Sequence, residues 1–103
     1  MTDTAHTPWI AHYPADVDWS GTIDQRTLTT YLGDTAKLYG SRPAIDFLGR
    51  KTNYQELNTL VARAAQGLKK MGVQHGTRVG LCLPNTPYAV IGTLAILRAG
   101  RPV

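Results

Sequence analysis

Residues 77–100 constrain the fold more than any other stretch, because they read as an interior strand followed directly by a buried helix. Within residues 79–83, aliphatic residues alternate with small uncharged ones, so neither face of a strand here would need contact with water. A helix over residues 87–99 follows, with Thr86 as its expected N-cap and Pro87 at the first helical position.

The expected helix over residues 87–99 is apolar on every side. Only Gly92 and Thr93 interrupt the apolar run over residues 89–97, and such a helix must be covered on more than one face. A strand followed by a helix is two thirds of a β-α-β unit, whose last third would be a parallel strand beginning near residue 101. We therefore expect these residues to be the first part of a larger protein, with little chemistry of their own.

A helix and a hairpin are predicted upstream of that segment. The helix begins at Thr27, carries an apolar stripe at three- and four-residue steps, and ends near Gly40. Residues 44–54 alternate as a β-hairpin whose turn is expected at Gly49 and Arg50.

A second upstream helix has the clearest start signal in the chain. Asn53 and Glu56 form a capping-box pattern, in which each side chain can satisfy a backbone N–H of the other residue. Gly72 stops this helix, and Gly100 is expected to close the last helix in the left-handed conformation. The apolar stripe after the capping box comprises Leu57, Leu60, Val61, Ala64, Ala65, Leu68 and Met71.

Taken in order, these elements predict an α/β fold made of helix, β-hairpin, helix, strand and helix. Residues 1–26 show no clear period and carry three large aromatic residues, Trp9, Tyr13 and Trp19. We expect them to form an extended arm that anchors its aromatic rings on a neighbouring surface. Residues 27–103 would then form a partial, incomplete α/β N-terminal subdomain.

Charge and cysteine content exclude several function classes. The net charge is +4, but the Lys and Arg residues are scattered, and no basic face with interleaved aromatics indicates nucleic-acid binding. The one cysteine, Cys82, excludes an internal disulfide and is expected to be a buried structural thiol. A reduced thiol fits a cytoplasmic compartment.

The sequence shows neither a secretory signal nor a membrane span. Residues 1–6 are polar and lack the apolar core of a signal peptide. The uncharged stretch 81–97 contains two prolines and Asn85, and its helical part is about half of the roughly 20 residues that a crossing needs. We expect a cytoplasmic protein, and peripheral contact with the inner face of a membrane stays open.

Motifs that carry catalysis are missing. The turn at residues 84–87 offers no glycine-rich cradle for a phosphate. Ser20 and Ser41 lie in no nucleophile elbow, and the acidic residues show no pairing typical of glycosidase or metal chemistry. Arg50 and Lys51 at a loop tip could attract phosphate, although solvation is the simpler reading. We assign no catalytic, cofactor-binding or metal-binding residue.

Several strings resemble the N-terminal beginning of the adenylate-forming acyl-CoA synthetases. Residues 53–57 (Asn-Tyr-Gln-Glu-Leu) resemble that family's Thr-Tyr-x-Glu-Leu, and residues 39–44 (Tyr-Gly-Ser-Arg-Pro-Ala) its Tyr-x-Asp-Arg-Pro-Ala. Residues 79–85 resemble a strand that ends in Leu-Pro-Asn, and residues 95–100 the Leu-(Lys/Arg)-Ala-Gly that precedes the next strand. Residues 9–14 (Trp-Ile-Ala-His-Tyr-Pro) are similar to the opening of bacterial long-chain fatty-acid–CoA ligases.

The resemblance implies a two-step ligase of fatty-acid metabolism. In such enzymes a fatty carboxylate attacks the α-phosphate of MgATP to give an acyl-adenylate and pyrophosphate, and the CoA thiol then displaces AMP. The family's phosphate-binding loop, nucleotide contacts, Mg-binding Glu and lid lysine all lie beyond the equivalent of Val103. The resemblance therefore transfers no catalytic residue, and we expect this chain to bind no ATP, Mg or CoA and to be inactive alone.

Two main functions stay open, and a basic nucleic-acid-binding module is a third and weaker hypothesis. The first is an N-terminal fragment of a fatty-acid–CoA ligase, whose partner is the remainder of the ligase fold. The second is a non-catalytic small α/β binding or scaffold protein derived from that family, which associates with itself or a ligase through uncovered apolar surface. No nucleic-acid partner is expected. Residues 101–103 (Arg-Pro-Val) depart from the family's next strand, because proline cannot donate to an interior ladder, and a truncation or frameshift would produce such a tail.

Overall fold

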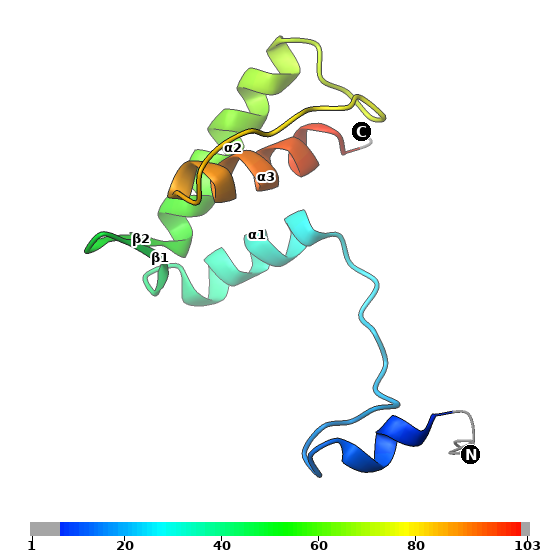
Figure 1. Cartoon of the computed structure of the whole chain (residues 1–103). Helices are drawn as coiled ribbons and strands as arrows, with labels where there is room; N and C mark the ends of the chain where they lie inside the picture. The colour runs from blue at the N-terminus through cyan, green and yellow to red at the C-terminus, as the bar shows by residue number, and fades with distance from the viewer. Residues whose placement is uncertain (1–6, 102–103) are drawn as a thin grey trace.

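Three helices and one β-hairpin form the body of the molecule in this computed structural model, which describes residues 7–101. A 3-10 helix, η1 (Pro8–His12), lies in a separate N-terminal arm (Figure 1). Helices and strands together confirm the expected α/β class. The elements of the body are α1 (Leu28–Tyr39), β1 (Pro43–Phe47), β2 (Arg50–Asn53), α2 (Tyr54–Lys70) and α3 (Pro87–Ala99).

The signals that the sequence places at the ends of α1 and α2 are confirmed. Asn53 Oδ1 accepts from the Glu56 N–H at 2.8 Å, and Glu56 Oε2 accepts from the Asn53 N–H at 3.3 Å, which completes the capping box of α2. Thr27 caps α1, because its side chain accepts from the Thr30 N–H at 3.3 Å. After α2, Gly72 adopts a φ of 99°, a conformation that costs glycine little.

The turn of the hairpin lies one residue earlier than predicted. Leu48 and Gly49 connect the strands with φ angles of 53° and 83°, and Arg50 already pairs with Phe47 in the antiparallel ladder. Positive φ at both central residues is typical of a type I′ turn, whose twist matches that of the flanking strands. Arg50 is therefore a strand residue and its side chain has a defined direction.

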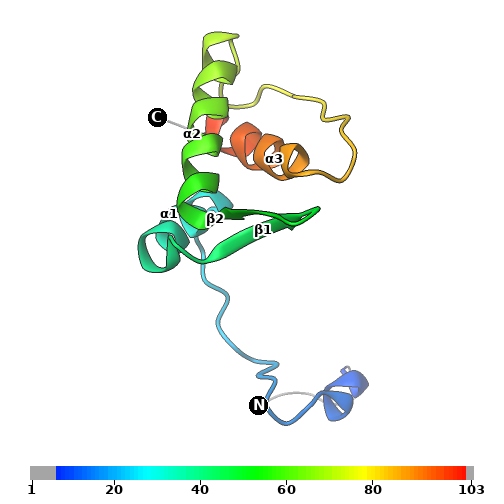
Figure 2. The same cartoon turned by 90° about the vertical axis from the view of Figure 1, so that its left-hand side faces the viewer.

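A small core forms where the three helices meet. Helix α2 is central, because α1 and α3 both pack against it, and its Val61 is 0% exposed. Both α3 and the hairpin project from the same side of α2 (Figure 2). The core cluster comprises Leu32, Leu57, Val61, Ala65, Ala95 and Ala99.

The described residues cover only one side of α3. Ala95 and Ala99 are buried, whereas Val90 and Leu97 are 39% and 44% exposed and Tyr88 is 72% exposed. The expectation that this apolar helix lacks a second covering layer is confirmed for the described part of the chain. Among the helices of residues 7–101, none has both the length and the apolar character needed to span a bilayer.

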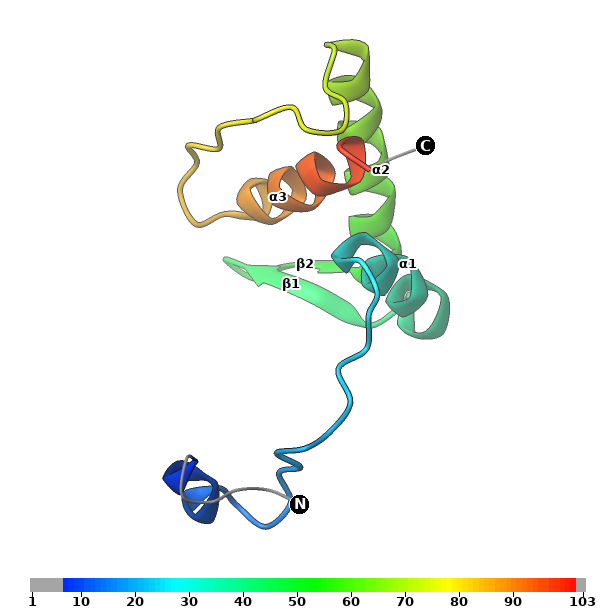
Figure 3. The ribbon, with the colours of Figure 1, turned by 90° about the vertical axis from the view of Figure 1, so that its right-hand side faces the viewer.

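Residues 78–83 do not form the predicted strand. They run as extended chain across α2 and α3 and have no β-partner among residues 7–101 (Figure 3). The alternation suits a strand, but a strand also needs a neighbour that accepts and donates its hydrogen bonds. Without that cover Leu81 and Leu83 are 44% and 48% exposed, and Cys82, expected to be buried, is exposed.

Thr86 and Gly100 flank α3 at the predicted positions, but neither residue caps the helix in the way predicted. The Thr86 hydroxyl donates to the Pro84 carbonyl at 3.3 Å and makes no capping bond to the helix, although Pro87 does occupy the first turn. Gly100 has a φ of −80° instead of a left-handed angle, and its N–H donates to the Ile96 carbonyl at 3.1 Å. This helix therefore ends by continuing its own hydrogen bonding for one more residue.

The arm, residues 7–26, extends away from the helices (Figure 1). Its large rings contact one another, with centroid distances of 6.0 Å between Trp9 and Trp19 and 5.3 Å between Tyr13 and Trp19. The division of the chain between residues 26 and 27 stays a prediction. The predictions for residues 1–6 and for residues 102–103 lie outside the described residues.

Candidate functional site

A cleft with a volume of about 360 Å³ opens between the hairpin and the start of α3. The hairpin and the start of α3 supply most of its lining, and Leu60 of α2 lines it as well. Figures 2 and 3 show that the hairpin and α3 lie on the same side of α2. The volume lies at the lower end of the range typical of small-ligand sites. The cleft is lined by Ile45, Phe47, Arg50, Thr52, Leu60, Thr86, Pro87, Tyr88 and Ile91.

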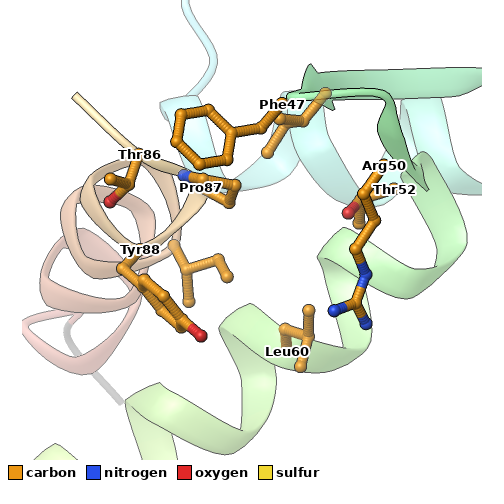
Figure 4. Close-up of a pocket in the computed structure, with 9 residues that line it drawn as sticks. Phe47, Arg50, Thr52, Leu60, Thr86, Pro87 and Tyr88 are labelled. Atoms are coloured by element: carbon orange, nitrogen blue, oxygen red, sulfur yellow. The ribbon is translucent and has the colours of Figure 1, made fainter.

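The apolar walls follow from the periods of the two elements that make them. Ile45 and Phe47 are two residues apart on β1, so their side chains leave the same face of the hairpin. Pro87 and Ile91 are four residues apart on α3 and therefore share a helical face. Figure 4 shows Phe47 reaching toward Pro87 across the cleft.

Arg50 and Tyr88 bring polar groups to this apolar space. In Figure 4 the guanidinium of Arg50 and the hydroxyl of Tyr88 both point into the cleft, from opposite walls. Among residues 7–101, the ion pairs are those of Arg26 with Asp24 and Asp34. The charge of Arg50 is therefore not neutralised by any described carboxylate, and the cleft favours an anionic, partly apolar occupant.

A second polar contact joins α2 to α3 away from the cleft. Arg98 donates from Nη2 to Asn58 Oδ1 at 2.8 Å. Burial, and then the nearby charge of Arg101, lowers the pKa of Arg98. This bond joins the C-terminal end of α3 to α2.

The residues of the cleft do not fit ATP, Mg or CoA. A triphosphate needs several converging backbone N–H groups or cations, whereas Arg50 is the single cation that lines this cleft. Across residues 7–101, no three His, Cys, Asp or Glu side chains gather into a group that could hold a metal ion. We derive no catalytic step from this chain.

Of the polar residues considered as site candidates in the sequence, Arg50 lies at the cleft, and Lys51, His75 and Ser20 do not line it. Arg50 lines the cleft, and Lys51 follows it on the hairpin. His75 lies with Nδ1 3.0 Å from the Gly100 carbonyl oxygen, and Ser20 donates to Asp18 Oδ1 at 3.1 Å. Sequence reasoning missed Tyr88 and the cleft itself. The four-residue spacing of Pro87 and Ile91 indicates a shared helical face, but no pattern in the sequence placed that face opposite the hairpin.

Comparison with known proteins identifies relatives over most of the chain. Residues 32–103 match the family described as AMP-binding enzyme. The long-chain-fatty-acid–CoA ligase of Bacillus subtilis (strain 168) is 36% identical over 93 residues, which are 90% of this chain and 17% of that protein.

Relatives whose names give other acids match as well. The salicyl-AMP ligase / salicyl-S-ArCP synthetase of Mycobacterium tuberculosis (strain ATCC 25618 / H37Rv) is 38% identical over 95 residues, 87% of this chain and 16% of that protein. The acetyl-coenzyme A synthetase of Streptomyces avermitilis is 43% identical over 67 residues, 60% of this chain and 10% of that protein.

The chain thus spans 17% or less of the length of these three relatives. The family match begins inside α1 and takes in the hairpin, α2, α3 and every residue of the cleft. It confirms the resemblance to adenylate-forming enzymes that residues 39–44 and 53–57 indicate. On this evidence the chain belongs to the family of AMP-binding enzymes.

Proposed function

We propose that this chain is the N-terminal part of a fatty-acid–CoA ligase. The complete enzyme converts a fatty acid, ATP and CoA to acyl-CoA, AMP and pyrophosphate. The part of it described here supplies a scaffold of helices and a hairpin, and it is inactive alone. The remainder of the ligase fold is its partner and covers the exposed side of α3.

The resemblance of residues 9–14 to the opening of bacterial long-chain fatty-acid–CoA ligases supports the choice of a fatty acid. The match to the Bacillus subtilis long-chain-fatty-acid–CoA ligase takes in 93 of the 103 residues, so it must include part of residues 1–26, which lie outside the family match. The salicyl-AMP ligase match, over 87% of this chain, reaches into residues 1–26 as well, so reach alone does not select the acid. Relatives named for salicylate and acetate are similar too, so the identity of the acid is the finer part of the proposal.

Inactivity of the isolated chain follows from the side chains of the cleft. Stabilising the charge that develops on a transferred phosphate takes several preorganised donors or a metal ion, and Arg50 is the one charged group that lines the cleft. We also propose a cytoplasmic location with peripheral contact at the inner face of the membrane, because a long fatty acid partitions into that layer.

Pyrophosphate release tests the proposal in two steps. The 103-residue chain incubated with palmitate and MgATP is expected to release no pyrophosphate above a protein-free blank. Release above that blank would refute the proposal that the catalytic groups lie in the remainder of the ligase. The second step reads the gene past codon 103 in all three frames for a Ser/Thr/Gly-rich loop that ends in Lys. The complete polypeptide is then assayed with palmitate, salicylate and acetate.

The assay with three acids tests the enzyme class and the identity of the acid separately. Adenylation of palmitate in preference to the other two supports the fatty-acid ligase. Preference for salicylate or acetate would keep the enzyme class and overturn the fatty acid. Absence of any such loop downstream would favour the second candidate, a non-catalytic binding or scaffold protein, for which the exposed Val90 and Leu97 provide a docking face.

A further inference from the structure

We propose that the turn of the hairpin docks on an anionic lipid surface, with Leu48 entering the apolar layer and Arg50 and Lys51 meeting the headgroups. Residues 47–51 are called the hairpin tip. The inference rests on the peripheral membrane contact proposed above and names the element that makes it. It does not depend on the ligase reaction, because it needs no group outside the described residues.

Leu48 has no packing role inside the chain. At 91% exposure it is the most exposed large apolar residue among residues 7–101, and it belongs neither to the core cluster nor to the side chains packed against it. Apart from its chain neighbours, no heavy atom lies within 4 Å of the place where a Cβ on Gly49 would sit, so the turn stands clear of the body. Burial within this chain therefore does not account for a leucine at this position.

The backbone of the turn makes leucine an unfavourable choice there. The φ of Leu48 is 53°, in the left-handed region that bulky side chains disfavour and that asparagine and glycine tolerate. Asn-Gly is the pair preferred in such a turn, and this chain has Leu-Gly. An apolar side chain held in an unfavourable conformation and in contact with water indicates a contact outside the chain.

The start of α3 adds a second amphipathic group on the same side of the molecule. Figures 2 and 3 show the hairpin and the chain leading into α3 projecting to the same side of α2. Tyr88, in the first turn of α3, is 72% exposed. An aromatic ring with a hydroxyl suits the boundary between lipid tails and headgroups, so Leu48 and Tyr88 contact one lipid surface together.

Basic residues stand directly behind Leu48. Arg50 and Lys51 follow the turn and are both exposed, and the one carboxylate of the two strands, Asp46, lies opposite Lys51 in the ladder. Residues 27–101 hold ten Lys or Arg and three Asp or Glu, which gives a net charge of +7. A positive body with an apolar tip favours an anionic lipid surface over a neutral one.

Cosedimentation with sucrose-loaded vesicles measures this contact. We expect the 103-residue chain to bind vesicles of equimolar phosphatidylcholine and phosphatidylglycerol, and to bind vesicles of phosphatidylcholine alone more weakly. Replacing Arg50 and Lys51 with glutamine should weaken binding to the anionic vesicles about fivefold for each charge and leave binding to the neutral vesicles unchanged. Added salt should weaken the binding of the wild type to the anionic vesicles, since it screens the attraction.

Leu48→Asn removes the apolar side chain and preserves the turn, because Asn-Gly suits this backbone. We expect this variant to unfold at the same urea concentration as the wild type or at a higher one. Its binding to the anionic vesicles should be about tenfold weaker, because no leucine side chain leaves water. Leu48→Met, which keeps an apolar side chain of similar size, should bind as the wild type does.

The matched control is Leu38→Asn, which makes the same change at another exposed leucine. Leu38 belongs to α1, and α1 lies at the base of the hairpin, away from its tip (Figure 2). This variant is expected to bind the vesicles as the wild type does.

The hairpin tip is overturned as the contact if Leu48→Asn binds like the wild type, or if Leu38→Asn loses as much binding. Equal binding of the wild type to both kinds of vesicle would overturn the role of the basic pair. Absence of wild-type binding to either would overturn this proposal together with the membrane contact on which it rests. The pyrophosphate assay decides the ligase proposal separately from all of these outcomes.

Discussion

Replacing Val61 with alanine measures how much the three-helix core contributes to stability. The Val61 side chain is 0% exposed where α1 and α3 meet α2. Losing two buried methyl-sized groups costs about 1.6 kcal/mol of transfer free energy at about 0.8 kcal/mol each, and a residual cavity adds to that cost. The better helix propensity of alanine returns about 0.5 kcal/mol. We expect the free energy of unfolding to fall by about 1–2 kcal/mol.

Val90→Ala is the matched control, because it makes the same chemical change on a helix that is covered on one side. Val90 is 39% exposed, so less transfer free energy is lost while the gain in helix propensity is the same. We expect the free energy of unfolding of this variant to stay within about 0.5 kcal/mol of the wild type. The difference between the two variants then reports burial alone.

Urea titrations followed by far-ultraviolet circular dichroism measure both values. Tryptophan fluorescence would not serve, because Trp9 and Trp19 report on the arm and not on the core. A loss of 1 kcal/mol also lowers the melting temperature by about 4–8 °C for a domain of this size. Equal losses at Val61 and Val90 would refute the one-sided burial of α3, and no loss at Val61 would refute the core.

Three further substitutions or reactions test local features. Asn53→Ala should lower the free energy of unfolding by about 1 kcal/mol and Asn53→Ser by much less, since serine restores the cap of α2; equal losses in urea titrations would contradict the capping box. Gly49→Ala should cost about 1 kcal/mol in the same titration, because Gly49 has a φ of 83° in the turn; an unchanged midpoint would argue against that turn. The Cys82 thiol should react with Ellman's reagent without denaturant, and reaction only after unfolding would show that it is covered.

The sequence predicted those elements whose signals are local. The capping box at Asn53 and Glu56, the start of a helix at Thr27 and the stop at Gly72 each involve bonds or angles within a few residues, and the structure confirms all of them. The hairpin was also predicted, with its turn misplaced by one residue, because the pair Leu48-Gly49 carries only one of the two usual turn residues.

The sequence failed where an element depends on distant neighbours. Residues 78–83 have the alternation of an interior strand, but no described segment lies beside them to pair with. The exposure of Cys82 follows from the same cause. The cleft was missed because it joins residues of β1 and β2 to residues of α3 about forty positions later, a contact that no local period encodes.

Residues 78–83 also determine how this chain behaves at high concentration. From Val79 to Leu83 the stretch bears no charge, and its extended backbone has no β-partner among the described residues, so another molecule can add along it. Short segments of this kind seed the stacking of identical chains into fibrils. A lysine in place of Leu81 or Leu83, both at the surface, would interrupt such growth, so the yield of soluble chain during expression depends on six residues that belong to no helix or strand.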